Sequence, residues 1–391
     1  MNSTNNSDGP INHLFVEYTN KNEYFHSCLF ISAFIFGIIA FFGIIFNLSV
    51  CIITAKYRKY YITLKSNTGI LHALASFFEI LHQSSHIIFL IKIIFFGMDF
   101  IPYKQALLIQ IPSVIGYFGA VFMFVTLSID RLLAVLIPIK YHNFKQFYYV
   151  IIQFFFILIH IIYGLFLMNM AKILTPNWKV SGGLGDLFTE PVNIITYIYY
   201  SDVCIISFAI IIYLIVGILI KFKTETTDER IKKMYLSLFL IVLVNIGGYL
   251  ICNLFFACLL LSIIKLTPIN IWFWNNFFAI FLNIAAASIG PILYINSGEY
   301  KLAYKRAYTE FKKSLNLNNS TISTINPTQI LCSKSFSLIL INSQTSIMQT
   351  NSNINIKLES TTTGQRFCVV CGEESDDELA MGIALLTKVL P

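Results

Sequence analysis

Long apolar runs separated by short polar gaps dominate the chain from about residue 29 to residue 295. A membrane-spanning helix needs roughly 20 mostly apolar residues, and seven runs reach that length. They cover residues 29–54, 70–94, 106–137, 147–170, 193–221, 234–264 and 270–295. A span in lipid must satisfy its own backbone hydrogen bonds, so helices are expected although isoleucine and phenylalanine are abundant. The pattern predicts an all-α membrane protein built as a seven-transmembrane helix bundle.

Lysine and arginine indicate the orientation of these helices, because short cytoplasmic loops carry an excess of both. Most of them follow the first, third, fifth and seventh runs, whereas the alternate gaps hold only a few lysines. The N-terminus is therefore expected outside and the C-terminus inside. Two sequons, at Asn2 and Asn5, agree with this orientation, since an outside N-terminus exposes them to glycosylation.

Composition excludes a soluble protein. Hydrophobic residues make up 56% of the 391 residues, charged residues only 12%, and the mean hydropathy is +0.71. A soluble domain carries about 25% charged residues. The net charge of +7 is spread over the gaps between apolar runs, so it forms no basic patch for nucleic acid. The lipid bilayer is the expected surrounding, and the plasma membrane the expected location of this multi-pass protein.

The third run ends in a charge pair, Asp130-Arg131, inside the stretch LSIDRLLAVLIPIKY. A helix-end anchor that reaches toward the interface explains Arg131 alone. The whole stretch, with Pro138 and Tyr141 after the pair, resembles the third-helix signature of rhodopsin-like G protein-coupled receptors. The resemblance implies that Asp130 restrains Arg131 at rest and that Arg131 reaches toward the G protein α-subunit in the active state. Leu132 departs from the family, which usually has an aromatic residue there.

Other runs resemble the same family in part. Asn47 in the first run is expected to hydrogen-bond across two helices. Pro291 and Tyr294 match the family's seventh-helix motif, with Gly290 in place of its asparagine. A proline inside a helix produces a kink, and a kink can serve as the two-state element of a switch. The run SGEYKLAYKRAY predicts an amphipathic helix over 298–313 on the inner membrane face.

Glu79 falls where the family has a buried aspartate that binds sodium in many members. The supporting polar positions are here Ala120 and Gly290. We therefore expect a structural or switch role for Glu79 and predict neither sodium nor another metal.

Three absences narrow the resemblance further. Ser113 stands where amine receptors carry an aspartate, and Ile284 stands where opsins carry a lysine. The outer loop between the fourth and fifth runs has no cysteine, so the disulfide usual in rhodopsin-like receptors is not expected. The resemblance to a particular group rests instead on three stretches, LKSNTGILHALASFFEILHQSSHIIF, IDRLLAVLIPIKY and SGEYKLAYKRAY. Through them the chain resembles nematode serpentine chemoreceptors of class sx, called Srsx, over about residues 30–308.

Polar side chains inside the outer halves of the runs are candidates for ligand binding. Glu79, His82 and His86 share one helix face, which either lines a ligand cavity or hydrogen-bonds to neighbouring helices. The candidate ligand-binding residues are His82, His86, Gln110, Ser113, Tyr117, Asp202 and Asn276.

The expected function is that of a chemosensory receptor. It would convert binding of an extracellular small molecule into activation of a heterotrimeric G protein. A neuropeptide receptor of the same fold is the alternative. A membrane transporter or metal-dependent membrane enzyme is less favoured, because neither an inverted repeat nor a full ligand cluster is evident; Cys368 and Cys371 supply half of a zinc site. We expect no enzymatic activity and no cofactor.

The domain organisation follows from these features. Residues 1–27 are expected to be an extracellular segment, 28–297 the helical domain, 298–313 the cytoplasmic amphipathic helix and 314–391 a disordered cytoplasmic tail. The tail is rich in serine, threonine and asparagine. Its hydroxyls make kinases, and arrestin after them, candidate partners.

Overall fold

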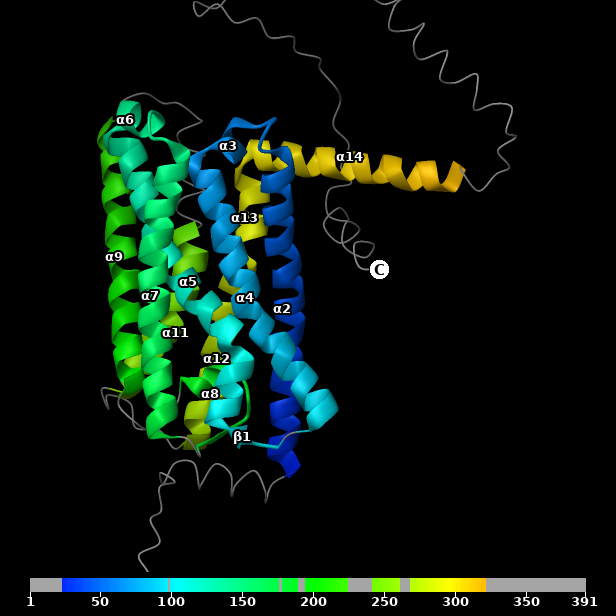
Figure 1. Ribbon diagram of the computed structural model, residues 1–391, viewed down its shortest axis with the longest axis vertical. Helices are drawn as coiled ribbons and strands as arrows, with labels where there is room; N and C mark the ends of the chain where they lie inside the picture. Colours follow the sequence, from blue (N-terminus) through cyan, green and yellow to red (C-terminus); the bar gives the residue numbers. More distant parts are fainter. Residues whose placement is uncertain are drawn as a thin grey trace, which may run out of the picture. The chain divides into compact units, whose positions relative to one another are not determined.

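The computed structural model describes residues 23–97, 99–175, 178–188, 194–223, 241–260 and 268–320, and most of them are helical (Figure 1). The chain divides into two compact units, Met1–Tyr304 and Lys305–Pro391. The first unit contains the helix bundle. The described part of the second unit is the later part of α14 (Gly298–Ser320), where Arg306 pairs with Glu310 one turn further on. The helix α14 is longer than the 298–313 expected from the sequence.

Five described helices are long and apolar enough to cross a membrane. They are α2 (Glu23–Tyr57), α4 (Asn67–Phe96), α5 (Tyr103–Leu136), α7 (Gln146–Leu174) and α9 (Ile194–Lys223). Each extends a few residues beyond the apolar run that predicted it, because a helix continues into polar residues at the membrane interface.

The sixth and seventh predicted spans are interrupted. A π-helical turn, Ile241–Ile246, precedes α11 (Gly247–Leu260), and the two ends of the predicted span 234–264 lie outside the described residues. The last span consists of α12 (Pro268–Ala287) and α13 (Ile289–Asn296), bent by 45° at Ser288. Pro291 lies just after the bend, and a proline cannot donate the backbone hydrogen bond that would join the two segments. The kink predicted at Pro291 is therefore present.

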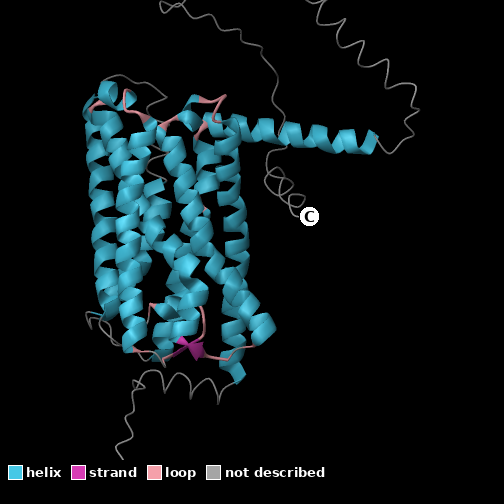
Figure 2. Cartoon of the chain, in the orientation of Figure 1, coloured by secondary structure: helices cyan, strands magenta, loops and turns pink. Residues whose placement is uncertain are grey.

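Short elements connect the helices at both ends of the bundle. At one end lie α3 (Ile62–Lys65) and α6 (Pro138–His142). Two antiparallel strands, β1 (Ile101–Pro102) and β2 (Lys179–Val180), pair at the opposite end, as Figure 2 shows. The short helix α8 (Leu184–Leu187) follows β2 in the loop between α7 and α9.

The helix α5 lies at the centre of the bundle. It packs against α4, α7 and α9, while α12 packs against α2 and α11, and α11 against α9. In its most apolar stretch, 67% of the α5 residues are buried, against 33% to 39% in the other four long spans. Lipid can therefore face the other helices, whereas α5 contacts mainly protein.

Close helix contacts depend on glycine at several places, and two of them bear on the site. A Cβ on Gly116 of α5 would lie 2.2 Å from the His82 backbone nitrogen of α4. A Cβ on Gly290 of α13 would lie 2.9 Å from the Phe46 carbonyl oxygen of α2. Gly290 occupies the place where rhodopsin-like receptors usually have asparagine, and the close approach of α2 explains why no side chain fits there.

Candidate functional site

Asp130 is the centre of a hydrogen-bond network at the end of α5. Its carboxylate is completely buried and accepts hydrogen bonds from three hydroxyl groups. Thr68 of α4 donates to Oδ2 at 2.6 Å, while Tyr141 of α6 and Tyr149 of α7 donate to Oδ1 at 2.6 and 3.0 Å. Burial and then the Asp130 charge raise the pKa of Tyr141 to about 12, so this hydroxyl keeps the proton it donates. Three elements are thereby fixed to one carboxylate.

Arg131 lies outside that network. Its side chain is half-buried, and its Nη2 is 3.5 Å from Nε2 of His72 on α4. Among the described residues, no acidic side chain lies within 4 Å of the guanidinium. The hydroxyl groups therefore take the place of Arg131 as partners of Asp130 in this structure, and the restraint of Arg131 by Asp130 stays a prediction. Pro138 is exposed at the first turn of α6, the helix that presents Tyr141 to Asp130.

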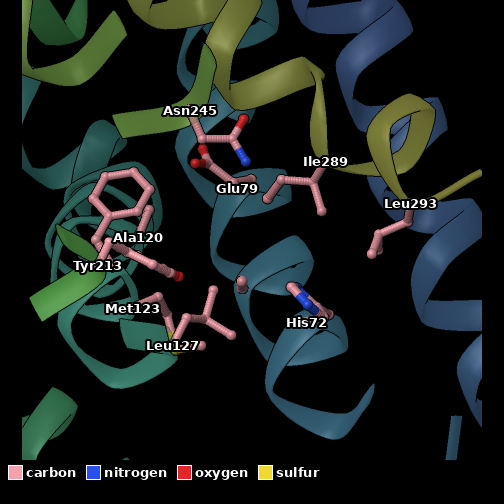
Figure 3. A pocket seen from close by; sticks show the side chains of 11 residues that line it. His72, Glu79, Ala120, Met123, Leu127, Tyr213, Asn245, Ile289 and Leu293 are labelled. Carbon is pink, nitrogen blue, oxygen red and sulfur yellow. The ribbon is translucent and has the colours of Figure 1, made fainter. Parts of the chain in front are cut away.

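A small cavity lies between the Arg131 end of the bundle and its middle. Its volume is about 20 Å³, which is enough for a water molecule. His72, Glu79, Tyr213 and Asn245 contribute polar groups to a lining that is otherwise apolar (Figure 3). Ala120 also lines it, as Figure 3 shows.

Glu79 forms a triad with His82 and Tyr249 in the middle of the bundle. The Tyr249 hydroxyl donates to Glu79 and is 2.9 Å from each carboxyl oxygen. Nδ1 of His82 is 3.1 Å from Oε2 of Glu79 and 3.0 Å from the Tyr249 oxygen. The tyrosine has one proton and gives it to Glu79, so Nδ1 of His82 donates if Glu79 is ionised and accepts if Glu79 carries a proton. The triad links α4 to α11 and supports a structural or switch role for Glu79, which stays a prediction.

A second polar network joins α5, α7, α9 and α11. The Tyr117 hydroxyl lies 2.9 Å from Oδ2 of Asp202 and 3.2 Å from Oδ1 of Asn253. Oδ1 of Asp202 is 3.7 Å from Nε2 of His160, and neither atom has a hydrogen-bond partner. Nδ2 of Asn253 donates to the backbone carbonyl of Tyr249, so this network adjoins the Glu79 triad.

The structure brings together three of the predicted ligand-binding residues, His82, Tyr117 and Asp202. The His82 and Tyr117 rings meet edge to face with centroids 5.5 Å apart. The sequence reasoning missed Tyr249, Asn253 and His160. Each is a polar group inside an apolar run, which was the available signal, but nothing in the sequence says which way it faces.

The other predicted ligand-binding residues have separate partners. Gln110 donates to the Gly182 carbonyl, Ser113 shares a hydrogen bond with Ser84, and the His86 ring stacks on Phe36. Asn276 accepts a hydrogen bond from Ser32 of α2 and donates to the Trp272 carbonyl. These contacts fix helices or loops to one another, so the ligand-binding roles of these four residues stay predictions.

Asn47 and the end of the last span hold α2 in place. The Asn47 amide donates to the Ala286 carbonyl at 2.9 Å, just before the bend between α12 and α13. The contact joins α2 to α12, and the structural role of Asn47 stays a prediction. Tyr294 packs edge to face on Tyr304, and Tyr304 shares a hydrogen bond of 2.5 Å with Ser49.

The loop between α7 and α9 is fastened by hydrogen bonds. The backbone of Tyr103 donates to the Trp178 carbonyl, and its hydroxyl donates to the Leu187 carbonyl. Asp186 accepts from the backbone and hydroxyl of Ser181. Burial raises the pKa of the Asp186 carboxyl, although the Ser181 hydrogen bonds and the Lys92 charge act in the opposite direction. These contacts attach the loop at the place where many receptors have a disulfide.

Several predictions fall on residues that the structure does not describe. They are the sequons at Asn2 and Asn5, the cysteines Cys368 and Cys371, and the tail after residue 320. Within the described ranges, no group of three or more histidine, cysteine or acidic side chains is placed to hold a metal ion.

Comparison with known proteins identifies the family. No curated protein matches the chain. The family model of the serpentine type seven-transmembrane G protein-coupled chemoreceptor Srsx matches residues 40–308, which is more than half of the 391 residues. The match includes all the networks described above. The chain therefore belongs to the Srsx family of serpentine seven-transmembrane G protein-coupled chemoreceptors.

Proposed function

We propose that the chain converts the binding of an extracellular small molecule into the activation of a heterotrimeric G protein. The observation that carries this proposal is the arrangement at the end of α5. Three hydroxyl groups donate hydrogen bonds to the Asp130 carboxylate. Arg131 lies beside His72 and has no acidic partner among the described residues. A guanidinium held this way is available to contact a G protein.

The orientation supports the same proposal. The basic gaps after the first, third and fifth spans favour the cytoplasmic side for α3, α6 and the Asp130 network. The strands β1 and β2 would then lie outside the cell, where the sequons at Asn2 and Asn5 would be open to glycosylation. The receptor would act in the plasma membrane, with kinases and arrestin acting on its tail.

Two networks connect the proposed ligand side with the cytoplasmic side. Tyr117 links Asp202 to Asn253, and Tyr249 links α11 to Glu79. A ligand that bonds better to one packing of these helices shifts the population toward that packing. The bend before Pro291 and the π-helical turn before α11 are the elements that can change.

The test is G-protein dissociation in cells that express the receptor, at rest and with pooled chemical extracts. Wild type is compared with Arg131→Ala at matched surface expression. We expect a signal in wild type and its loss in Arg131→Ala. Lys140→Ala, in the same cytoplasmic gap, is the control for loss of one positive charge. An equal signal in wild type and Arg131→Ala would refute the assignment of Arg131.

A further inference from the structure

Asp202 differs from the other buried acids of the described bundle. Glu79, Asp130 and Asp202 are each at most 3% exposed. Both oxygens of Glu79 and both oxygens of Asp130 accept hydrogen bonds. Among the described residues, Asp202 accepts one hydrogen bond, from Tyr117 at Oδ2, and its Oδ1 has no hydrogen-bond partner. A buried carboxylate oxygen without a donor is costly to the folded state, so Oδ1 of Asp202 is suited to a hydrogen-bond donor from a ligand.

His160 provides a second unused atom opposite that oxygen. Its ring is 6% exposed, and Nε2 lies 3.7 Å from Oδ1 of Asp202 without a hydrogen-bond partner. With its proton on Nδ1, the imidazole presents Nε2 as an acceptor. Two acceptors cannot hydrogen-bond to each other, and in the other tautomer the Nε2–H would face Oδ1 across 3.7 Å, which is too long for a hydrogen bond. One donor atom about 2.8 Å from each fits between them.

The charge of the site favours a cation as that donor. Among the described residues, no lysine or arginine lies within 4 Å of Asp202. A water molecule would satisfy the two acceptors, but only a cation would also stabilise the ionised form of Asp202 against its burial. A protonated primary amine has three N–H donors and a positive charge, so it can bond to both acceptors and also stabilise an ionised Asp202.

Aromatic rings surround the two acceptors. Phe118 and Phe122 lie 5.5 Å from the His160 ring, measured between centroids. Phe188, from the loop between α7 and α9, lies 5.1 Å from Tyr117 and 6.2 Å from Phe118. Aromatic faces attract cations. Phe188 is buried, and its carbonyl accepts a hydrogen bond from the Tyr199 hydroxyl, so the loop supplies a fixed part of this aromatic wall.

We infer that Asp202 and His160 form a recognition site for the protonated primary amine of a small organic ligand, with Tyr117 positioning the Asp202 carboxylate. The absence of an acid at Ser113 argues against the usual amine site on α5, but here the acid comes from α9. Ser113 is instead hydrogen-bonded to Ser84. The inference deepens the proposed function and rests on it for its meaning, while the binding itself can be measured without a G protein.

The experiment measures thermal unfolding of the purified receptor in lipid nanodiscs. The probes are butylamine, isopentylamine and phenethylamine, each paired with the neutral alcohol of the same carbon skeleton. We expect at least one amine to raise the unfolding midpoint of wild type more than its alcohol does. Asp202→Asn, which keeps the shape and removes the charge, should weaken the apparent amine affinity at least tenfold. Asp99→Asn, which removes an exposed carboxylate from the loop before α5, should leave the amine effect unchanged.

Two results would overturn the inference. One is that no amine stabilises wild type more than its paired alcohol. The other is an undiminished amine effect in Asp202→Asn. If that variant does not fold, His160→Gln provides the same measurement, and full amine affinity there would also overturn the site.

The outcome separates this inference from the proposed function. Amine binding that depends on Asp202, without G-protein dissociation, would support the site and count against the signalling role. An Arg131-dependent G-protein signal without amine stabilisation would support the signalling role and count against the amine site.

Discussion

The Tyr249 hydroxyl offers a direct measure of how much the Glu79 triad stabilises the bundle. Tyr249→Phe removes the donor 2.9 Å from both Glu79 oxygens and keeps the ring. The packing of that ring on Phe124, with centroids 5.0 Å apart, is therefore unchanged. A hydrogen bond to a charged group contributes about 1.5–3 kcal/mol, and one between neutral groups about 0.5–1.5 kcal/mol. The size of the loss therefore also reports whether Glu79 is ionised.

The assay is equilibrium unfolding of purified wild type and variant under one set of detergent and lipid conditions. A loss of 1.5–3 kcal/mol increases the ratio of unfolded to folded protein roughly 10- to 100-fold. Tyr200→Phe is the matched control, because 39% of the Tyr200 side chain is exposed on α9. In the double variant with Glu79→Gln, the two losses should not add, because both changes remove the same contact. If Tyr249→Phe costs no more than Tyr200→Phe, the triad does not stabilise the bundle and the reasoning is wrong.

Two further predictions concern packing and pH. Gly116→Ala should reduce the folded yield of the receptor severalfold, because the new Cβ would lie 2.2 Å from the His82 backbone. Gly298→Ala, at an exposed position where no atom of the described residues lies within 4 Å of the new Cβ, should fold like wild type, and equal yields of the two variants would contradict this account. Folding raises the pKa of the Asp186 carboxyl above its ordinary value of 3.8, so the folded loop binds this proton more tightly than the unfolded chain does. The folded loop therefore loses stability as the pH rises from 3.8 toward the raised pKa. Amide-exchange protection of residues 178–188 should fall over that range in wild type and stay constant in Asp186→Asn; parallel curves would refute the prediction.

The hydrophobic pattern was sufficient to predict the spans because lipid leaves the backbone few alternatives. Apolar runs at 106–137 and 147–170 became α5 (Tyr103–Leu136) and α7 (Gln146–Leu174). The bend between α12 and α13 could be predicted as well, because proline acts locally on its own helix. The π-helical turn at Ile241–Ile246 could not, since the residues that form it are ordinary apolar helix formers apart from Asn245.

The sequence does not predict the hydrogen-bond partners of the buried polar groups. The resemblance to rhodopsin-like receptors makes Glu79 and Asp130 candidates, but Tyr249 is 170 residues from Glu79, and Thr68 is 62 residues from Asp130. Such contacts depend on helix rotation, which the hydrophobic pattern fixes poorly when most faces of a span are apolar.

The same reasoning explains why the buried polar groups of this bundle are informative about function. In water, an unused carboxylate oxygen costs little, because solvent completes its hydrogen bonds. In the described part of the bundle, Asp130 receives three hydroxyl donors and Glu79 is hydrogen-bonded to a tyrosine and a histidine, whereas Asp202 receives one donor. Packing alone would favour an apolar residue in place of Asp202, since an apolar side chain has no oxygen that needs a hydrogen bond. A charge kept there at a cost to folding is better explained by a ligand that it binds than by the stability of the bundle.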